Sequence, residues 1–170
     1  MRWCCGATLA LLLASGVRAA PPHEHGVARL DVAVEAARIT LFLDMPLDSL
    51  LGFEHAPRDE AERKRVDEAQ TRLRDAATLF SIDPAAHCAP GAVALNAPVL
   101  SGAATGKDEH AELAASYEFA CKDAARAGFI EVGLFDAFPR LQRVDVQTAT
   151  RKGQMKLTLK RPAGRIALVR

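Results

Sequence analysis

The chain has 170 residues, 49% of them hydrophobic and 25% charged, and a formal net charge of +1. Removal of residues 1–20, argued below, would take away Arg2 and Arg18 and leave 150 residues, 20 of them basic and 21 acidic. This length is enough for one domain with a core, and the absence of a basic block argues against nucleic acid as a partner.

The first twenty residues have the pattern of a signal peptide. Arg2 gives a short positive start, the apolar run 7–14 follows, and small residues at 17–20 fit the rule for signal peptidase. The run is too short to span a bilayer, and no second one follows. We therefore expect an exported precursor with a signal peptide at 1–20, a single domain at 21–170 and no membrane span in the mature chain. The alternative is an uncleaved anchor.

Two cysteines remain after cleavage, Cys88 and Cys121. An even number in an exported chain predicts a disulfide bond. The loop that this bond closes, about 34 residues long, would stabilise the fold by roughly 3–4 kcal/mol in the chain-entropy model. The alternative is two free thiols in the core.

The mature chain begins with a pattern of period two. Apolar residues alternate from 30 to 34 and from 39 to 43, which predicts a hairpin of two half-buried strands. Its turn at 35–38 lacks the Gly or Asn that a tight hairpin prefers.

A helix is predicted at about residues 59–77. Asp59 can cap it, with Glu62 three residues on as the partner of a capping box. Apolar residues recur every three or four positions and form one face of this helix: Val66, Ala69, Leu73, Ala76 and Phe80. The charged residues between them are expected to face solvent.

Short strands are predicted for the rest of the chain, at 93–100, 113–121, 129–135, 144–148, 155–159 and 166–169. Their short connections favour antiparallel pairing. The predicted fold class is therefore α+β, with largely antiparallel β-sheets and one long amphipathic helix packed against them.

The histidines are the candidate metal ligands. His23 and His25 are two residues apart, so on an extended chain their side chains point the same way and can share one zinc ion. His110 has Asp108 and Glu112 close by. The alternatives are a loose polar N-terminus and an ordinary polar loop.

A third candidate is His55, which follows Glu54 just before the predicted helix. On the sequence alone, a structural histidine bonded to the backbone is the favoured interpretation of His55.

We expect His23, His25 and His110 to share zinc, because two imidazoles leave a tetrahedral ion short of ligands. Asp108 or Glu112 can add an oxygen. The strand that His110 precedes could pair near the first hairpin. His55 is the next choice as a ligand.

Catalytic signatures are missing from the sequence. The His-Glu-x-x-His helix, the Gly-x-Ser-x-Gly elbow, the phosphate loop and the Cys-x-x-Cys pair are all absent. We therefore expect no catalytic residues and no organic cofactor, and a protein that is not an enzyme.

Five segments together resemble a known family: HEHGVA at 23–28, LGFEHAP at 51–57, residues 110–121 with ASYEFAC, LFDAFP at 134–139, and Gly-Gln at 153–154. The chain resembles the ZrgA-like zinc-uptake proteins of Gram-negative bacteria over nearly all of its mature part. The resemblance implies a periplasmic protein that binds zinc and assists its import beside an ABC-type zinc importer or a periplasmic zinc-binding protein. Many members carry a long run rich in His and Asp before the segment matching His110. Here the run is reduced to 106–110, so one or two zinc ions are expected.

Two other functions remain open at this point. One is a zinc-dependent hydrolase, for which Glu54 is the obvious candidate for the general base. The other is a structural envelope protein whose histidines are incidental.

Overall fold

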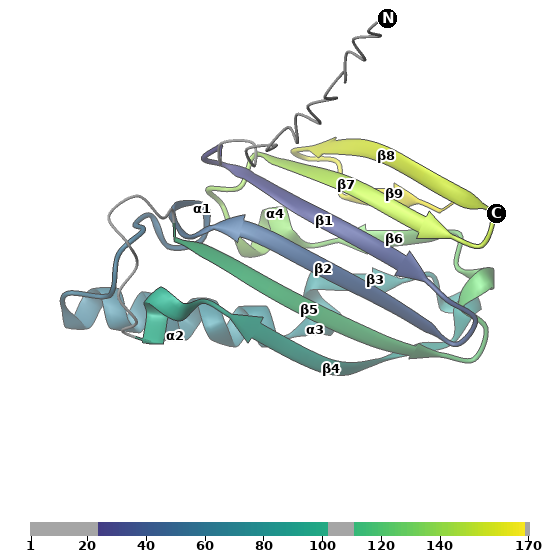
Figure 1. Ribbon diagram of the computed structural model, residues 1–170, viewed down its shortest axis with the longest axis horizontal. Helices are drawn as coiled ribbons and strands as arrows, with labels where there is room; N and C mark the ends of the chain where they lie inside the picture. The colour runs from purple at the N-terminus through teal and green to yellow at the C-terminus, as the bar shows by residue number, and fades with distance from the viewer. Residues whose placement is uncertain (1–23, 102–110, 169–170) are drawn as a thin grey trace, which may run out of the picture.

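The computed structural model describes residues 24–101 and 111–168. They form a six-stranded sheet in the order β4-β5-β2-β1-β7-β8 and a three-stranded sheet in the order β3-β6-β9. Figure 1 shows the large sheet in front, with α2, α3, α4 and the small sheet behind it. None of the helices in these two ranges is long and apolar enough to cross a membrane.

The strands are β1 (Val27–Val34), β2 (Arg38–Pro46), β3 (Phe80–Ile82), β4 (Cys88–Asn96), β5 (Glu112–Cys121), β6 (Phe129–Val132), β7 (Arg143–Thr150), β8 (Gly153–Lys160) and β9 (Arg165–Ala167). The α-helices are α1 (Leu47–Leu51), α2 (Glu60–Arg74), α3 (Ala76–Leu79) and α4 (Leu134–Ala137). Three 3₁₀ turns are η1 (Pro84–Ala86), η2 (Pro98–Ser101) and η3 (Ala124–Arg126). The mixture of sheets and helices agrees with the α+β class, and most of the regular structure is β-sheet.

The predicted hairpin is confirmed, because β1 and β2 pair antiparallel from Arg29–Asp44 to Val34–Ile39. The alternating apolar residues face the core, and five of them are at most 2% exposed: Leu30, Val32, Ile39, Leu41 and Leu43. The strand after His110 also pairs with this hairpin as expected, since β5 lies antiparallel to β2.

One pairing departs from the antiparallel expectation. β1 and β7 are parallel, from Val27–Arg143 to Ala33–Ala149. The prediction relied on tight connections, which join only neighbours in sequence. β7 is not a sequence neighbour of β1, because the chain passes through β3 and β6 of the small sheet between them. A tight connection therefore does not force these two strands to be antiparallel.

The prediction of a helix at about 59–77 was wrong at the C-terminal end. Asp59 does cap α2, accepting a hydrogen bond from the Glu62 amide at 2.8 Å. α2 ends at Arg74, however, because the Asp75 carboxylate accepts from both the amide and the hydroxyl of Thr78 and begins the separate helix α3. Phe80, assigned to the apolar face of the predicted helix, lies in β3 and is 1% exposed.

The bounds of the later predicted strands differ as well, most clearly for three of them. The strand predicted at 129–135 ends at Val132, and Gly133 then begins α4; a Cβ at Gly133 would lie only 2.6 Å from the Thr78 carbonyl oxygen, which explains the glycine. The strand predicted at 93–100 runs from Cys88 to Asn96, after which Pro98 opens a 3₁₀ turn. β9 covers 165–167 instead of 166–169.

The predicted disulfide bond is confirmed. Cys88 and Cys121 are register partners at one end of the β4–β5 ladder, and their sulfurs are bonded. The bond therefore ties the edge strand β4 to the interior of the sheet.

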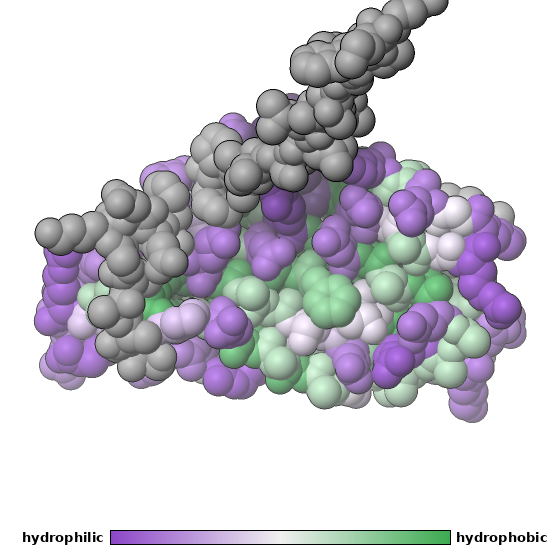
Figure 2. All heavy atoms as spheres, viewed as in Figure 1, coloured by the Kyte–Doolittle hydropathy of each residue, from purple (hydrophilic) through white to green (hydrophobic). Residues whose placement is uncertain are grey.

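The core lies between the large sheet and the layer behind it. Tyr117 of β5 and Phe80 of β3 join the two layers through an edge contact, with ring centroids 4.9 Å apart. The other face of the large sheet points to solvent, and Phe42 near its centre is 49% exposed. Figure 2 shows apolar side chains over the middle of this face and hydrophilic ones around its margin.

Tyr117 carries a buried polar atom in this core. The residue is fully buried, and its hydroxyl has no hydrogen-bond partner within the described part of the chain. Burial raises the pKa of Tyr117, because the charged phenolate would lose its hydration. Alkali should therefore destabilise the fold. The neutral phenol of Tyr117 contributes its full stability below the ordinary tyrosine pKa of about 10, and this stability is lost as pH rises through the folded-state pKa.

We predict that Tyr117→Phe keeps or slightly raises the free energy of unfolding at pH 7, since no hydrogen bond is lost. The variant should also lose less stability than the wild type between about pH 9 and pH 11. Urea unfolding at several pH values measures both effects. Tyr117 is the single tyrosine of the chain, so absorbance follows its ionisation alone. Identical pH dependence of stability in both proteins would contradict the prediction.

Candidate functional site

The structure describes half of the residues predicted to bind zinc. Those within the described ranges are His25, His55 and Glu112, and those outside them are His23, Asp108 and His110.

His25 is held in a turn that leads into β1. Gly26 has φ +78°, a left-handed conformation that glycine adopts without strain, and its amide donates to the Ser49 hydroxyl at 2.8 Å. Ser49 lies in α1 and is 1% exposed. The turn is thereby fixed against the first helix, and the His25 side chain remains 62% exposed.

The His25 imidazole lies between two carboxylates. Its Nδ1 is 3.3 Å from an oxygen of Asp48, in the first turn of α1, and its Nε2 is 3.7 Å from Oε1 of Glu54. Glu54 follows Gly52, whose φ of +84° ends α1. The two ends of one short helix thus present both acids to the same ring. We name His25, Asp48 and Glu54 the His25 cluster.

The geometry of the His25 cluster can accommodate a zinc ion. Nitrogen and oxygen ligands of one tetrahedral zinc ion, each bound at about 2.0–2.2 Å, lie roughly 3.4 Å apart. The 3.7 Å between His25 Nε2 and Glu54 Oε1 is too long for a hydrogen bond but close to that separation. Asp48 at the other ring nitrogen stands where a carboxylate commonly orients a metal-bound histidine.

The described residues do not complete a metal site. In the ranges 24–101 and 111–168, no three His, Cys, Asp or Glu residues are grouped closely enough to hold an ion. His25 and Glu54 would supply two donors, so a tetrahedral ion would need two more from water or from other parts of the chain.

His55 has a different environment from Glu54. Its Nδ1 is 3.0 Å from the Ala56 carbonyl oxygen and 3.8 Å from Glu62, and its ring stacks on Phe53 at 4.9 Å between centroids. Phe53 is 8% exposed and anchors this loop in the core. These contacts fit the structural interpretation of His55, with the ring held by backbone and by an aromatic neighbour.

The start of β5 lies at the same end of the sheet as the His25 cluster. Glu112 is the register partner of Pro46, and the Leu47 amide donates to the Ala111 carbonyl at 2.9 Å. The chain therefore enters β5 beside the first residue of α1, one residue from Asp48. Three segments that are far apart in sequence, 24–26, 47–55 and 111–112, meet at this end.

An ion-pair chain borders the cluster. Arg143 at the start of β7 donates to Glu24 at 2.8 Å and also lies 3.3 Å from Asp145. The hydrogen bond to Glu24 raises the pKa of Arg143, with the charge of Asp145 adding to it. Glu24, the residue before His25, is thus bound to β7.

Asp48 was not predicted from the sequence, and Glu54 was considered beside His55 or as a catalytic base, not as a partner of His25. An acid in the first turn of a helix is common for electrostatic reasons alone, so Asp48 carried no separate signal. Glu54 could be linked to His25 only if the two ends of α1 were known to face the turn before β1.

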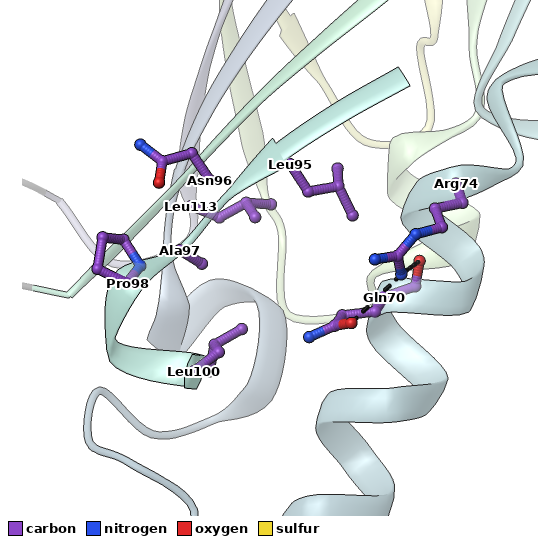
Figure 3. A pocket seen from close by; sticks show the side chains of 8 residues that line it. All are labelled: Gln70, Arg74, Leu95, Asn96, Ala97, Pro98, Leu100 and Leu113. Carbon is purple, nitrogen blue, oxygen red and sulfur yellow. Dashed lines mark hydrogen bonds between the residues drawn. The ribbon is translucent and has the colours of Figure 1, made fainter. Parts of the chain in front are cut away.

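A pocket of about 250 Å³ lies elsewhere, between α2 and the β4–η2 segment. Figure 3 shows Leu95, Leu100 and Leu113 on one side and the hydrogen-bonded pair Gln70 and Arg74 on the helix opposite. Its lining contains no histidine, cysteine or carboxylate, so its chemistry does not suit a metal ion.

A family model described as ZrgA family zinc uptake protein matches residues 22–168. The matched range includes the nine strands of the described ranges and the His25 cluster. No curated protein matches the chain. The family match indicates a role in zinc uptake and names no zinc ligand.

We predict that Ser49→Ala lowers the free energy of unfolding by about 1–3 kcal/mol, because it leaves the buried Gly26 amide without its acceptor. A matched control is Ser81→Ala at an exposed position of β3, which should change stability by less than about 0.5 kcal/mol. Urea unfolding measures both. Equal effects of the two substitutions would show that the Ser49 bond does not hold the turn.

Proposed function

The chain belongs to the ZrgA family of zinc uptake proteins, and on that premise we propose that it is a periplasmic zinc-binding accessory protein without catalytic activity. The observation that carries the proposal is the 3.7 Å contact between His25 Nε2 and Glu54 Oε1, with Asp48 at the other ring nitrogen. Zinc in this proposal is cargo that the protein takes up and gives away.

The exposure of the His25 cluster supports a cargo site. Structural zinc sites are closed and fully ligated by protein. Here the His25 side chain is 62% exposed and the two carboxylates are 29% and 25% exposed, so an ion could enter and leave without unfolding of the sheet.

Each residue of the cluster has a separate role in the proposal. His25 Nε2 and Glu54 Oε1 bind the ion, and Asp48 holds the imidazole in the tautomer that leaves Nε2 unprotonated. Asp48 is therefore a positioning residue whose loss should weaken zinc binding without removing a ligand.

The remaining ligands are expected from the sequence. His23 directly precedes Glu24, which is bound to Arg143, and His110 directly precedes Ala111, which is bonded to Leu47. Both anchored residues lie at the end of the sheet that carries the His25 cluster. His23 and His110 stay our proposed further ligands, with Asp108 or Glu112 as an additional oxygen donor and one or two ions in total.

The compartment and the partner follow from the same proposal. The signal-peptide pattern of residues 1–20 and the Cys88–Cys121 disulfide support an oxidising compartment, for which we propose the periplasm. A zinc uptake protein in that compartment must pass its cargo to a transport system. We propose an ABC-type zinc importer or its periplasmic zinc-binding protein as the recipient.

We predict that calorimetric titration of the mature protein shows zinc binding that His25→Ala and Glu54→Gln each weaken by about tenfold or more. Asp48→Asn should weaken binding by about 10–100-fold through the orientation of His25. The control is His87→Asn, at the opposite end of the sheet, where asparagine tolerates the φ of 50°. Its affinity should equal that of the wild type.

Two results would contradict this assignment. Unchanged affinity in a folded His25→Ala variant would exclude His25 as a ligand. Loss of affinity in His55→Ala with retention in His110→Ala would move the site to His55 and its neighbours.

Hydrolysis of a test ester by the zinc-loaded protein, above the rate of free zinc, would contradict the proposed lack of catalysis.

A further inference from the structure

The two edges of the large sheet are built differently. The edge strand β4 contains Pro90 and Gly91, and its register with β5 shifts between Pro90 and Val93. Proline and bulges are common devices that prevent another strand from pairing with an edge. β8, at the other edge, has neither: it pairs with β7 without interruption from Arg143–Lys160 to Thr150–Gly153. Among the described strands, none pairs with the outer edge of β8.

The side chains of β8 are arranged in two rows. Met155 and Leu157 are partly buried and lie on the core side, while Lys156, Thr158 and Lys160 are exposed on the solvent side. Lys152 stands in the turn directly before the strand. Three of the six lysines of the chain are thus concentrated within nine residues at this edge.

Acidic residues lie near one of these lysines: Asp31 of β1 and Asp145 of β7 line the same hollow of the sheet as Lys156. Between residues 140 and 168 the only acidic residue is Asp145. Asp145 lies 3.3 Å from Arg143 and accepts a hydrogen bond from the Thr158 hydroxyl at 2.9 Å. Its charge is therefore shared with Arg143 and Thr158, while Lys152 and Lys160 lie outside that hollow, so the edge keeps an excess of positive charge.

The charge of β8 decides which strand can pair with it. A second copy of this chain pairing through its own β8 would bring both lysine rows onto one face, and like charges on neighbouring strands repel. An acidic strand would instead place carboxylates beside the lysines. A lipid surface could attract the same lysines but could not supply the backbone ladder that the open edge offers.

We propose that the free edge of β8 binds an extended acidic segment of another protein, which joins the large sheet as an additional strand. The Lys160 end of β8 lies beside Arg143, which is bonded to Glu24 next to His25. The docked segment would therefore reach the end of the sheet that carries the His25 cluster. The docking depends on β8 and not on zinc, so it can be tested independently of the proposed function.

The probe is a fluorescent peptide of eight residues in which glutamate and valine alternate. We expect its anisotropy titration to show binding that weakens as salt rises from about 0.05 to 0.5 M. The double variant Lys156→Glu/Lys160→Glu should weaken binding by about tenfold or more. The control variant Lys64→Glu/Lys122→Glu makes the same change in net charge at exposed positions outside β8, and should stay within about twofold of the wild type.

A second comparison separates strand pairing from charge attraction. The same peptide with N-methyl groups on alternate amides keeps its charge but cannot complete a ladder, and it should bind much more weakly. Amide hydrogen exchange of residues 154–160 should slow only with the unmodified peptide. The proposal is overturned by no binding at about 1 mM peptide, by equal binding of the methylated peptide, or by equal loss in both double variants. Lysine-dependent binding to phosphatidylglycerol vesicles without peptide binding would overturn it in favour of a membrane surface.

Discussion

The register of β2 between β1 and β5 is the constraint on which the rest of the structure depends. Ile39, Leu41 and Leu43 all face the core and are fully buried, and a slip of one residue would turn all three to solvent. Each buried side chain of this kind is worth about 1.5–3 kcal/mol. β2 continues directly into α1, and β5 begins opposite Pro46, so this register also sets where Asp48 and Glu54 lie relative to His25.

Much of the fold could be predicted from period-two patterns, but only where a strand has one wet and one buried face. β1, β2 and β5 have that environment and were found. β4 was misplaced because its edge position leaves Ala89, Pro90 and Gly91 exposed, so its sequence does not alternate. Phe80 continued the helical spacing of residues 66–76, yet the side-chain bonds of Asp75 to Thr78 end that helix first. The parallel partner of β1 carried no local signal, because parallel pairing depends on distant parts of the chain.

The candidate site shows the same division between local and distant information. The sequence identified His25, and the two-residue spacing to His23 suggested a metal. It could not identify the carboxylates around the ring, since they are brought to His25 by a five-residue helix packed against the turn before β1. Adjacency in the sequence was also a misleading guide to the site. Glu54 and His55 are neighbours in the chain, but Glu54 contacts His25 whereas His55 packs on Phe53.

The Cys88–Cys121 bond has a consequence for how this protein can change over evolution. The β4–β5 ladder runs from the disulfide to the pair Asn96–Ala114, so the ends of the connection between these strands are held close together whatever its length. Lengthening a closed loop costs little, about 0.6 kcal/mol for each doubling. Lineages can therefore expand or shorten the segment between β4 and β5, and with it the number of histidine and carboxylate side chains that it carries, while the sheet and the entry into α1 stay as they are.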